Sequence, residues 1–366
     1  QSVAFKVVAS LSTCIFYFLA TFVFTRPVLS LMVIGNSQAE LILDEGQKYM
    51  YLMGFIGIQM MISSILSSSY REIGRVRVIL VITLIAAGSN AFLNWVFIYG
   101  HLGMPRLEVE GAAYATIIAK TVEMLLLIGY TIKERPEFIS FSVFKRIDWA
   151  LFGRILKKGS LLIMSQMMWV LSESFTAAIY NGRGNAAVVS GMAASFSIAN
   201  LFFISFDGIT TATGVLIGKS LGRNELDDAR KEKTWMLSAA IIFGCIMCLV
   251  GVVTVLLVPV VFGNLSIDAQ NICRAMLLLM ALFMPLWTFV NTQLAVCRAG
   301  GDTKVGFLVD GGTTAVMIPM LLILAFFTNA SPVMMYFGVK ALDVGKIIVA
   351  THEMKKERWV VNLSNA

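Results

Sequence analysis

Charged residues are scarce in this sequence. They make up 14% of its 366 residues, whereas hydrophobic residues make up 58%, and the mean hydropathy is +0.80. Soluble domains carry roughly 25% charged residues. The scarcity of charge therefore excludes an ordinary soluble domain and indicates a chain built mainly of membrane-embedded segments.

Histidine and cysteine are also rare, which limits the metal and redox chemistry open to the chain. The two histidines, His101 and His352, both lie at polar connectors. The cysteines lie in or at the ends of hydrophobic runs, with no histidine nearby: Cys14, Cys245, Cys248, Cys273 and Cys297. The sequence offers neither a cluster of zinc ligands nor the nucleophile and base of an intramembrane enzyme. We therefore expect a protein that is not an enzyme and that uses no cofactor.

Long hydrophobic runs make up most of the chain. A helix needs about 20 apolar residues to cross a bilayer. Ten runs meet this length, and they fall at 7–34, 49–70, 78–99, 112–132, 159–181, 187–217, 234–262, 275–297, 305–328 and 332–351. The first run is too long for a cleaved signal peptide and is followed by further spans. The sequence predicts an all-α, polytopic protein with ten transmembrane helices in a lipid bilayer.

The connectors between these runs alternate in charge. YREIGRVR at 70–77 and CRAGGDTK at 297–304 are basic, whereas connectors between them, such as HLGMPRLEVEG at 101–111, carry little positive charge. Cytoplasmic loops retain Lys and Arg, so both ends of this chain are predicted to be cytoplasmic. The net charge of +7 follows from this topology, and no nucleic-acid partner is implied.

Two of the basic connectors resemble each other. SYREIGRVRV at 69–78 aligns with VCRAGGDTKV at 296–305, which places Arg71 on Arg298 and Gly74 on Gly301. Both copies run in the same direction through the membrane. The alignment therefore predicts two helix bundles related by a parallel pseudo-two-fold repeat.

The position of the repeat predicts the domains. It falls between the fourth and fifth of six runs in the second half, but between the second and third of four in the first half. We expect that two helices of the first half are absent from this chain. The predicted domains are an amino-terminal lobe at 1–132, a cytoplasmic connector at 133–158, a carboxyl-terminal lobe at 159–354 and a cytoplasmic tail at 355–366. Two lobes on either side of a central cleft are typical of a transporter.

Three junctions resemble one transporter family in the right order. They are NAFLNWVFIYGHLGMPRLEVEGAAYAT at 90–116, TGVLIGKSLGRNELDDAR at 213–230 and CRAGGDTK at 297–304. Each is similar to a junction of the multidrug and toxic compound extrusion (MATE) family, and together they match family helices 3 to 12. The resemblance implies a secondary active antiporter that exports small amphiphilic or cationic compounds by alternating access, driven by Na+ or H+. It also implies multidrug efflux by a monomeric protein. The expected location is the plasma membrane, and specifically the bacterial inner membrane.

Glu173 is the main candidate for cation coupling. It lies in the apolar segment 160–180, where an ionised carboxylate costs about 2.5–3.5 kcal/mol on insertion scales. The resemblance implies that Glu173 binds the coupling cation of the carboxyl-terminal lobe, and Na+ at this position is the only metal we expect. The structural alternative is a carboxyl group paired with a neighbouring helix.

Asp310, within VGFLVDGGTT, is a second candidate implied by the resemblance, and its alternative is a residue near the cytoplasmic interface. Many relatives also carry an aspartate in the tenth family helix, and Trp287 stands at that position here. The cation would therefore be coordinated differently, with Asn291, Gln293 or Asp310.

The amino-terminal lobe offers weaker candidates. Asn90 and Asn94 lie one turn apart on one helix face, where one branch of the family has Asn-x-x-x-Asp, and neither side chain titrates. We therefore place coupling in the carboxyl-terminal lobe. Lys120 and Glu123, three residues apart, are predicted to neutralise each other.

Asp343, Lys346, Asp207 and Gln166 are further candidates for lining a cleft or taking part in coupling, and Lys340 is considered with the first two. Lys340, Asp343 and Lys346 are spaced three residues apart, so they either neutralise one another or reach Glu173 and Asp310. Asp207 is expected where the run 187–217 kinks, and Gln166 shares the span of Glu173.

A flippase for lipids or lipid-linked oligosaccharides is the alternative function, since that related class has a similar design with two lobes. It would need a basic cleft for phosphate groups. Only Lys120, Lys340 and Lys346 are available within the runs, so we rank this reading below efflux.

Overall fold

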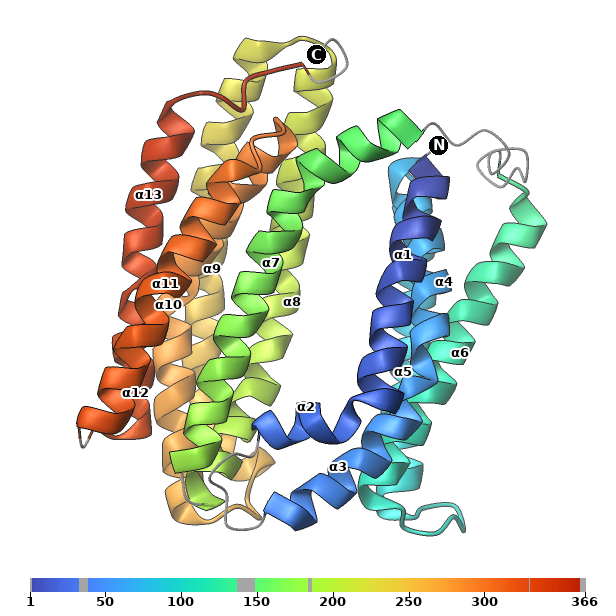
Figure 1. The fold of residues 1–366 in the computed structure, drawn as a ribbon, viewed down its shortest axis with the longest axis vertical. Coiled ribbons are helices and arrows are strands. Elements are labelled where there is room, and N and C mark those ends of the chain that lie inside the picture. The colour runs from blue at the N-terminus through green and yellow to red at the C-terminus, as the bar shows by residue number, and fades with distance from the viewer. Residues whose placement is uncertain (1, 33–38, 137–148, 184–185, 329, 363–366) are drawn as a thin grey trace. The chain divides into compact units, whose positions relative to one another are not determined.

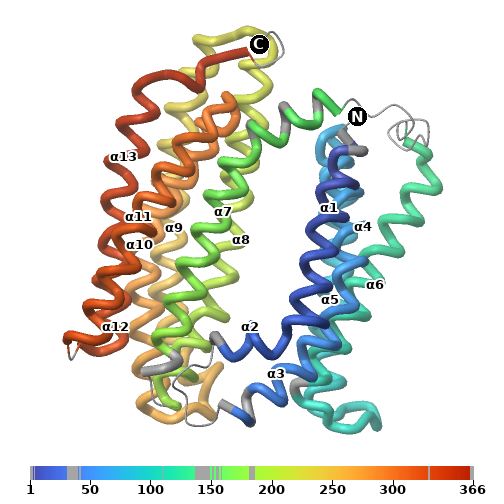
Figure 2. Tube along the Cα trace, in the orientation of Figure 1, coloured from blue at the N-terminus to red at the C-terminus, as the bar shows by residue number. Residues whose placement is uncertain are grey.

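The fold is described from a computed structural model, which covers residues 2–32, 39–136, 149–183, 186–328 and 330–362 (Figures 1 and 2). All regular structure in these residues is helical. The chain divides into two compact units, an amino-terminal unit at Gln1–Gly153 and a carboxyl-terminal unit at Arg154–Ala366. The central part of the predicted connector, 137–148, lies outside the described residues, as does the end of the tail at 363–366.

In the described residues of the amino-terminal unit there are six α-helices and one π-helix. They are α1 Ser2–Phe18, η1 Leu19–Val23, α2 Thr25–Met32, α3 Ala39–Gly54, α4 Ile56–Glu72, α5 Val76–Tyr99 and α6 Glu108–Glu134. The carboxyl-terminal unit contains α7 Trp149–Arg183, α8 Ala186–Gly222, α9 Leu226–Val261, α10 Ile267–Ala299, α11 Lys304–Phe327, α12 Pro332–Ala341 and α13 Asp343–Lys355, with the first turn of α7 falling before its boundary.

Eight of these helices are long and apolar enough to cross a membrane. A ninth span is formed if Leu43–Gly54 and Ile56–Glu72 are taken together, with a bend of 44° between them. The predicted count of ten is not confirmed. The last predicted run, 332–351, is divided at Leu342 into α12 and α13 and carries three charged residues. These charges make it less apolar than the other runs.

The first predicted run, 7–34, is not one straight helix. It changes from α1 into a π-helical turn at η1, and α2 then leaves in a different direction (Figure 1). The hydroxyl of Thr21 donates to the carbonyl of Tyr17 at 2.8 Å, and that of Thr25 donates to the carbonyl of Thr21. Such bonds between threonine and the preceding turn bend helices, and Pro27 adds a residue that cannot donate a backbone bond.

The centre of the carboxyl-terminal unit is α10. Its buried side chains include Met276, Met280 and Met284, which pack with residues of α8, α11 and α12 in one core. Glycines bring the neighbouring helices close to α10. A Cβ at Gly244 of α9 would lie 2.5 Å from the Cα of Pro285. Small residues at membrane helix contacts allow this approach.

The two copies of the predicted repeat form the same turn. The N–H of Gly74 bonds the carbonyl three residues before it at 3.1 Å, and Gly301 makes the equivalent bond at 3.0 Å. In both copies the following N–H bonds the carbonyl five residues before it at 2.9 Å. Both glycines have positive φ, 78° and 79°, which is the usual end of a helix at glycine. The repeat is therefore confirmed in the local backbone.

The start of the tail packs against the carboxyl-terminal unit. Trp359 is buried, with 1% exposure, and a Cβ at Gly300 would lie 1.7 Å from its carbonyl oxygen. Arg230 of α9 forms an ion pair with Glu357 at 2.9 Å. The described part of the tail is thus held at the ends of α9 and α10.

Candidate functional site

Glu173 is paired with a lysine from another helix. Its Oε1 lies 2.6 Å from Nζ of Lys340, so the contact joins α7 to α12 across 167 residues of sequence. The Glu173 side chain keeps 30% exposure and the Lys340 side chain 13%. The geometry is that of the structural alternative, a carboxyl group paired with a neighbouring helix. The pairing leaves the predicted coupling role of Glu173 untested.

Two aromatic rings surround the lysine. The Nζ of Lys340 lies 5.7 Å from the ring centroid of Trp287 and 5.4 Å from that of Tyr336. Ammonium groups at such distances are attracted to the faces of aromatic rings. Lys340 therefore has one carboxylate and two rings as neighbours.

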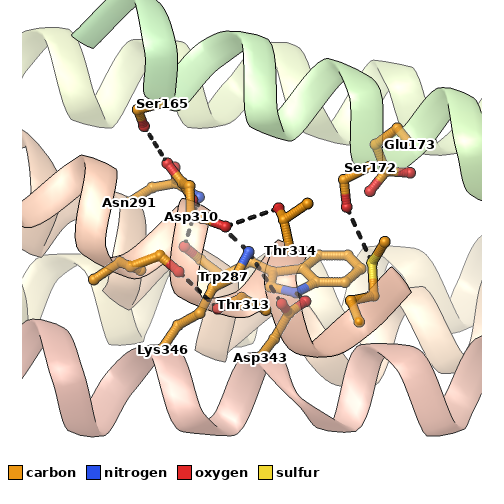
Figure 3. A network of polar contacts seen from close by, with 12 residues as sticks. Ser165, Ser172, Glu173, Trp287, Asn291, Asp310, Thr313, Thr314, Asp343 and Lys346 are labelled. Carbon is orange, nitrogen blue, oxygen red and sulfur yellow. Dashed lines mark hydrogen bonds and ion pairs between the residues drawn. The ribbon is translucent and has the colours of Figure 1, made fainter. Parts of the chain in front are cut away.

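Asp343 extends these contacts into a polar network, which also includes Trp287, Lys346 and Asp310. Its Oδ2 accepts a hydrogen bond of 2.8 Å from the indole Nε1 of Trp287, and its Oδ1 lies 3.1 Å from Nζ of Lys346 (Figure 3). The Asp343 side chain is only 8% exposed. A buried carboxylate is stabilised when both oxygens have such partners. Trp287 thus connects the Lys340 contact to Asp343.

Asp310 closes the network on α11. Its Oδ1 lies 3.9 Å from Nζ of Lys346, and its Oδ2 accepts a hydrogen bond of 2.5 Å from Ser165 of α7 (Figure 3). Arg298, at the end of α10, interacts electrostatically with Asp310. The network therefore links α7, α10, α11, α12 and α13.

The local sequence explains how α12 and α13 carry this network. Ser331 caps α12, where its hydroxyl accepts from the N–H of Met334, and Pro332 occupies the first helical turn. The chain then breaks at Leu342, between Lys340 and Asp343. Lys346 follows Asp343 by three residues, a spacing that brings the two side chains together on one helix face.

The charges in this network balance. The acids are Glu173, Asp310 and Asp343, and the bases are Lys340, Lys346 and Arg298. Removing one member of a buried ion pair typically costs about 3–5 kcal/mol, because the other charge is left without a partner. A cation that binds one of these carboxylates must therefore displace the base already there.

Other predicted site residues of this unit lie beside or outside the network. Asn291 donates to the backbone carbonyl of Trp287 at 2.9 Å, and Gln293, which is fully buried, donates to Thr351 of α13 at 2.8 Å. Gln166 and Asp207 are exposed. The helix α8 is continuous through Asp207, and a kink at that position stays a prediction.

The predicted polar residues of the amino-terminal unit lie close together. Asn94 donates to Asn90 at 3.0 Å, and Asn90 lies 3.4 Å from the hydroxyl of Thr116 on α6. Lys120 and Glu123 form the predicted ion pair at 2.8 Å. Coupling by Asn90 or Asn94 stays a prediction.

Several members of the network could not be identified from the sequence. Ser165 and Tyr336 are ordinary residues of apolar helices, and no motif distinguishes them. Trp287 was considered only as the replacement for an aspartate. The sequence offers one signal for the hydrogen bond between Trp287 and Asp343, because the indole N–H of a buried Trp usually finds an acceptor. Within the described ranges, no group of three or more His, Cys, Asp and Glu residues could hold a metal ion.

The described residues therefore define a helical, multi-pass membrane protein with paired charged groups among the helices of its carboxyl-terminal unit. The sequence model of the MatE family matches residues 1–96 and 162–334. The chain is a member of the MatE family, the MATE family of transporters.

Curated relatives agree with this assignment. The chain is 26% identical over 291 residues to the "Probable multidrug resistance protein NorM" of Mesorhizobium japonicum, a match that covers 76% of this chain and 61% of the relative. It is 24% identical over 312 residues to the protein of the same name from Listeria innocua, with 83% and 67% covered. The chain thus spans about two thirds of the length of these relatives or less.

Solved structures share the fold. An inward-facing multidrug resistance MATE family transporter of the MOP superfamily matches with a TM-score of 0.73 at 16% identity, covering 96% of this chain and 77% of that one. A MOP superfamily transporter from Pyrococcus furiosus matches with a TM-score of 0.75 at 18% identity, covering 97% and 79%. Both matches support the helical fold with two lobes that the sequence predicted.

Proposed function

We propose that this chain belongs to a secondary active transporter that exports small amphiphilic or cationic compounds in exchange for Na+ or H+. Membership of the MATE family and the name of the relatives, probable multidrug resistance protein, support this class of function. Alternating access of a central binding region to the two sides of the membrane would carry the substrate across.

The observation that carries this proposal is the paired state of Glu173 and Asp310. Both carboxylates lie on candidate membrane-spanning helices and are linked through lysines to α12 and α13. A cation that loads either carboxylate changes the charge balance of several helices at once. This provides a physical route from ion binding to helix movement, since buried charges seek new partners when an existing one is lost.

The expected setting is the bacterial inner membrane, with the protein as a monomer. The basic connectors support a cytoplasmic position for both ends of the chain. A multi-pass topology fits the apolar helices of both units.

The flippase alternative is disfavoured by the lysines. Lys120 is paired with Glu123, Lys340 with Glu173, and Lys346 with Asp343. Basic groups that already have carboxylate partners have less charge to offer to the phosphate of a lipid substrate.

Transport by the purified protein in lipid vesicles tests the proposal. An imposed Na+ or pH gradient should drive efflux of a fluorescent cationic dye by the unmodified protein, and Glu173→Gln should abolish this gradient-driven transport. Asp228→Asn is the matched control, because Asp228 is an exposed carboxylate with its own lysine partner at 3.1 Å. Undiminished transport by Glu173→Gln would remove Glu173 from the mechanism.

A further inference from the structure

The surroundings of the Lys340 ammonium are those of a bound cation. It has a carboxylate oxygen at 2.6 Å and the faces of two aromatic rings at 5.4 and 5.7 Å. Proteins bind ammonium ligands with the same combination of a carboxylate and aromatic faces. Here the ammonium is supplied by the chain itself, from a different helix than the carboxylate.

The same position offers a further oxygen. The hydroxyl of Tyr180 has no hydrogen-bond partner although the residue is 1% exposed, and it interacts electrostatically with both Glu173 and Lys340. Tyr336 and Asp343 are the other ionisable groups that act on Lys340. Tyr180 lies seven residues after Glu173 on α7, so its hydroxyl is a polar group of the same helix near the pair's charges.

Lys340 also has a second carboxylate to which it can move. Asp343 follows it by three residues, across the break at Leu342, and interacts with it electrostatically. Asp343 is held at present by Lys346 at 3.1 Å, and Lys346 in turn lies 3.9 Å from Asp310. If Lys340 moves to Asp343, Lys346 can move to Asp310, and each lysine keeps a carboxylate partner.

We propose that Lys340 is the resident cation of the Glu173 site, and that its ammonium moves to Asp343 when another monovalent cation takes Glu173. This inference rests on the proposed role of Glu173 in coupling. Lys340 is then the residue that sets how strongly a coupling cation must bind. The shift of Lys340 and Lys346 by one carboxylate each transmits the binding event to α12, α13 and α11.

A permanent structural ion pair predicts a different behaviour. In that case Lys340 would serve only to neutralise Glu173, and its removal would leave a damaged protein with no cation site. If Lys340 is a resident cation, removal of its ammonium group should instead leave a cation-binding site at Glu173 that is already formed.

Equilibrium binding of radiolabelled Na+ to the purified protein, at constant pH and ionic strength, separates these readings. Lys340→Met should bind one Na+ with a dissociation constant about tenfold or more below that of the unmodified protein. Lys340→Arg, which keeps the positive charge, should show no such gain. The double variant Lys340→Met with Glu173→Gln should lose the gain again.

Lys231→Met is the matched control, since it removes a lysine from the exposed Asp228 pair of the same unit, and its Na+ binding should be unchanged. If Lys340→Met does not fold, the comparison is made with Lys340→Ala purified in n-propylammonium, which supplies the missing part of the side chain. Removal of the amine should then permit Na+ binding.

A variant without Lys340 that binds Na+ no better than the unmodified protein would overturn the inference. The assay involves no transport, so it is independent of the proposed function. A gain in Na+ binding together with absence of gradient-driven transport would support the resident cation and reject the antiporter.

Discussion

Trp287 contacts two groups of opposite charge. Its indole N–H donates to Asp343 at 2.8 Å, while its ring lies 5.7 Å from the ammonium of Lys340. Trp287 brings no charge of its own, and it holds the acid of α13 beside the lysine of α12. It therefore holds both charged groups in place and adds no charge to the network.

The hydrogen bond of Trp287 should be measurable by substitution. Trp287→Phe keeps an aromatic face for Lys340 but removes the donor to the buried Asp343. Loss of a partner for a buried polar group costs about 1–3 kcal/mol, so the unfolding temperature of the purified protein in detergent should fall. Trp235→Phe, at a position with 66% exposure, is the control. Equal unfolding temperatures for the two variants would contradict this role.

At this scale, the sequence predicted the candidates and left two alternatives for their partners, each other or Glu173 and Asp310. The spacing of Lys340, Asp343 and Lys346 and the apolar surroundings of Glu173 could be read directly. Which lysine pairs with which acid depends on how each helix is rotated about its axis and how far it extends into the bundle. These helices are far apart in sequence. The short-range rule would have paired Lys340 with Asp343, whereas its ion pair is with Glu173 on α7.

At the scale of the elements, the position of the described tail depends on Gly300, in the connector after α10. The backbone of Trp359 occupies the space where a side chain at position 300 would lie. Gly300→Ala should therefore displace the tail, and limited proteolysis should cut it several times faster than in the unmodified protein. Gly218→Ala is the control, because a Cβ there meets nothing within 4 Å. Equal cleavage rates would show that the tail does not depend on Gly300.

The tail should also respond to acid. The hydrogen bonds from Arg230 lower the pKa of Glu357 below its ordinary value of 4.5. A lowered pKa in the folded protein means that this contact contributes stability above pH 4.5, and that the contribution is lost as the pH falls through the folded pKa. Cleavage of the tail by an acid-active protease should accelerate in that range. Glu357→Gln should remove most of this pH dependence, and an unchanged profile would contradict the contact.

Helices were easier to predict than their interruptions. Runs of apolar residues located most spans, because each span must bury its backbone and be apolar along its length. The interruptions at η1 and Leu342 depend on hydroxyl contacts and on charges that find partners elsewhere, and no single residue signals them. The helix α8 is continuous through Asp207, because an acid and a glycine in sequence do not by themselves break a helix.

For the molecule as a whole, the membrane orientation is the prediction that rests most on sequence. From the basic connectors we predict that residues 70–77, residues 297–304 and the chain end lie in the cytoplasm. Green fluorescent protein fused after residue 366 should be fluorescent, and alkaline phosphatase fused there should be inactive. A phosphatase fused within 101–105 should be active. The opposite pattern would reverse the orientation.

The match to the MatE family and the helical fold are consistent with each other. The coupling role of the network is our proposal. The turns at Gly74 and Gly301 match in geometry, as a repeat requires. The network occurs only around Glu173, Asp310 and Asp343 in the part of the carboxyl-terminal unit that is described. The corresponding pair of the amino-terminal unit, Lys120 and Glu123, lies within one helix, so it cannot link helices in the same way.

Dye transport by vesicles containing the Glu173→Gln and Asp310→Asn double variant tests the coupling role most directly. Uphill efflux driven by an imposed Na+ or pH gradient is compared with exchange of dye across the membrane in the absence of any gradient. We predict that the double variant loses gradient-driven efflux but retains exchange, because the substrate pathway survives while ion coupling does not. Full gradient-driven efflux by this variant would contradict the assignment of coupling to these carboxylates.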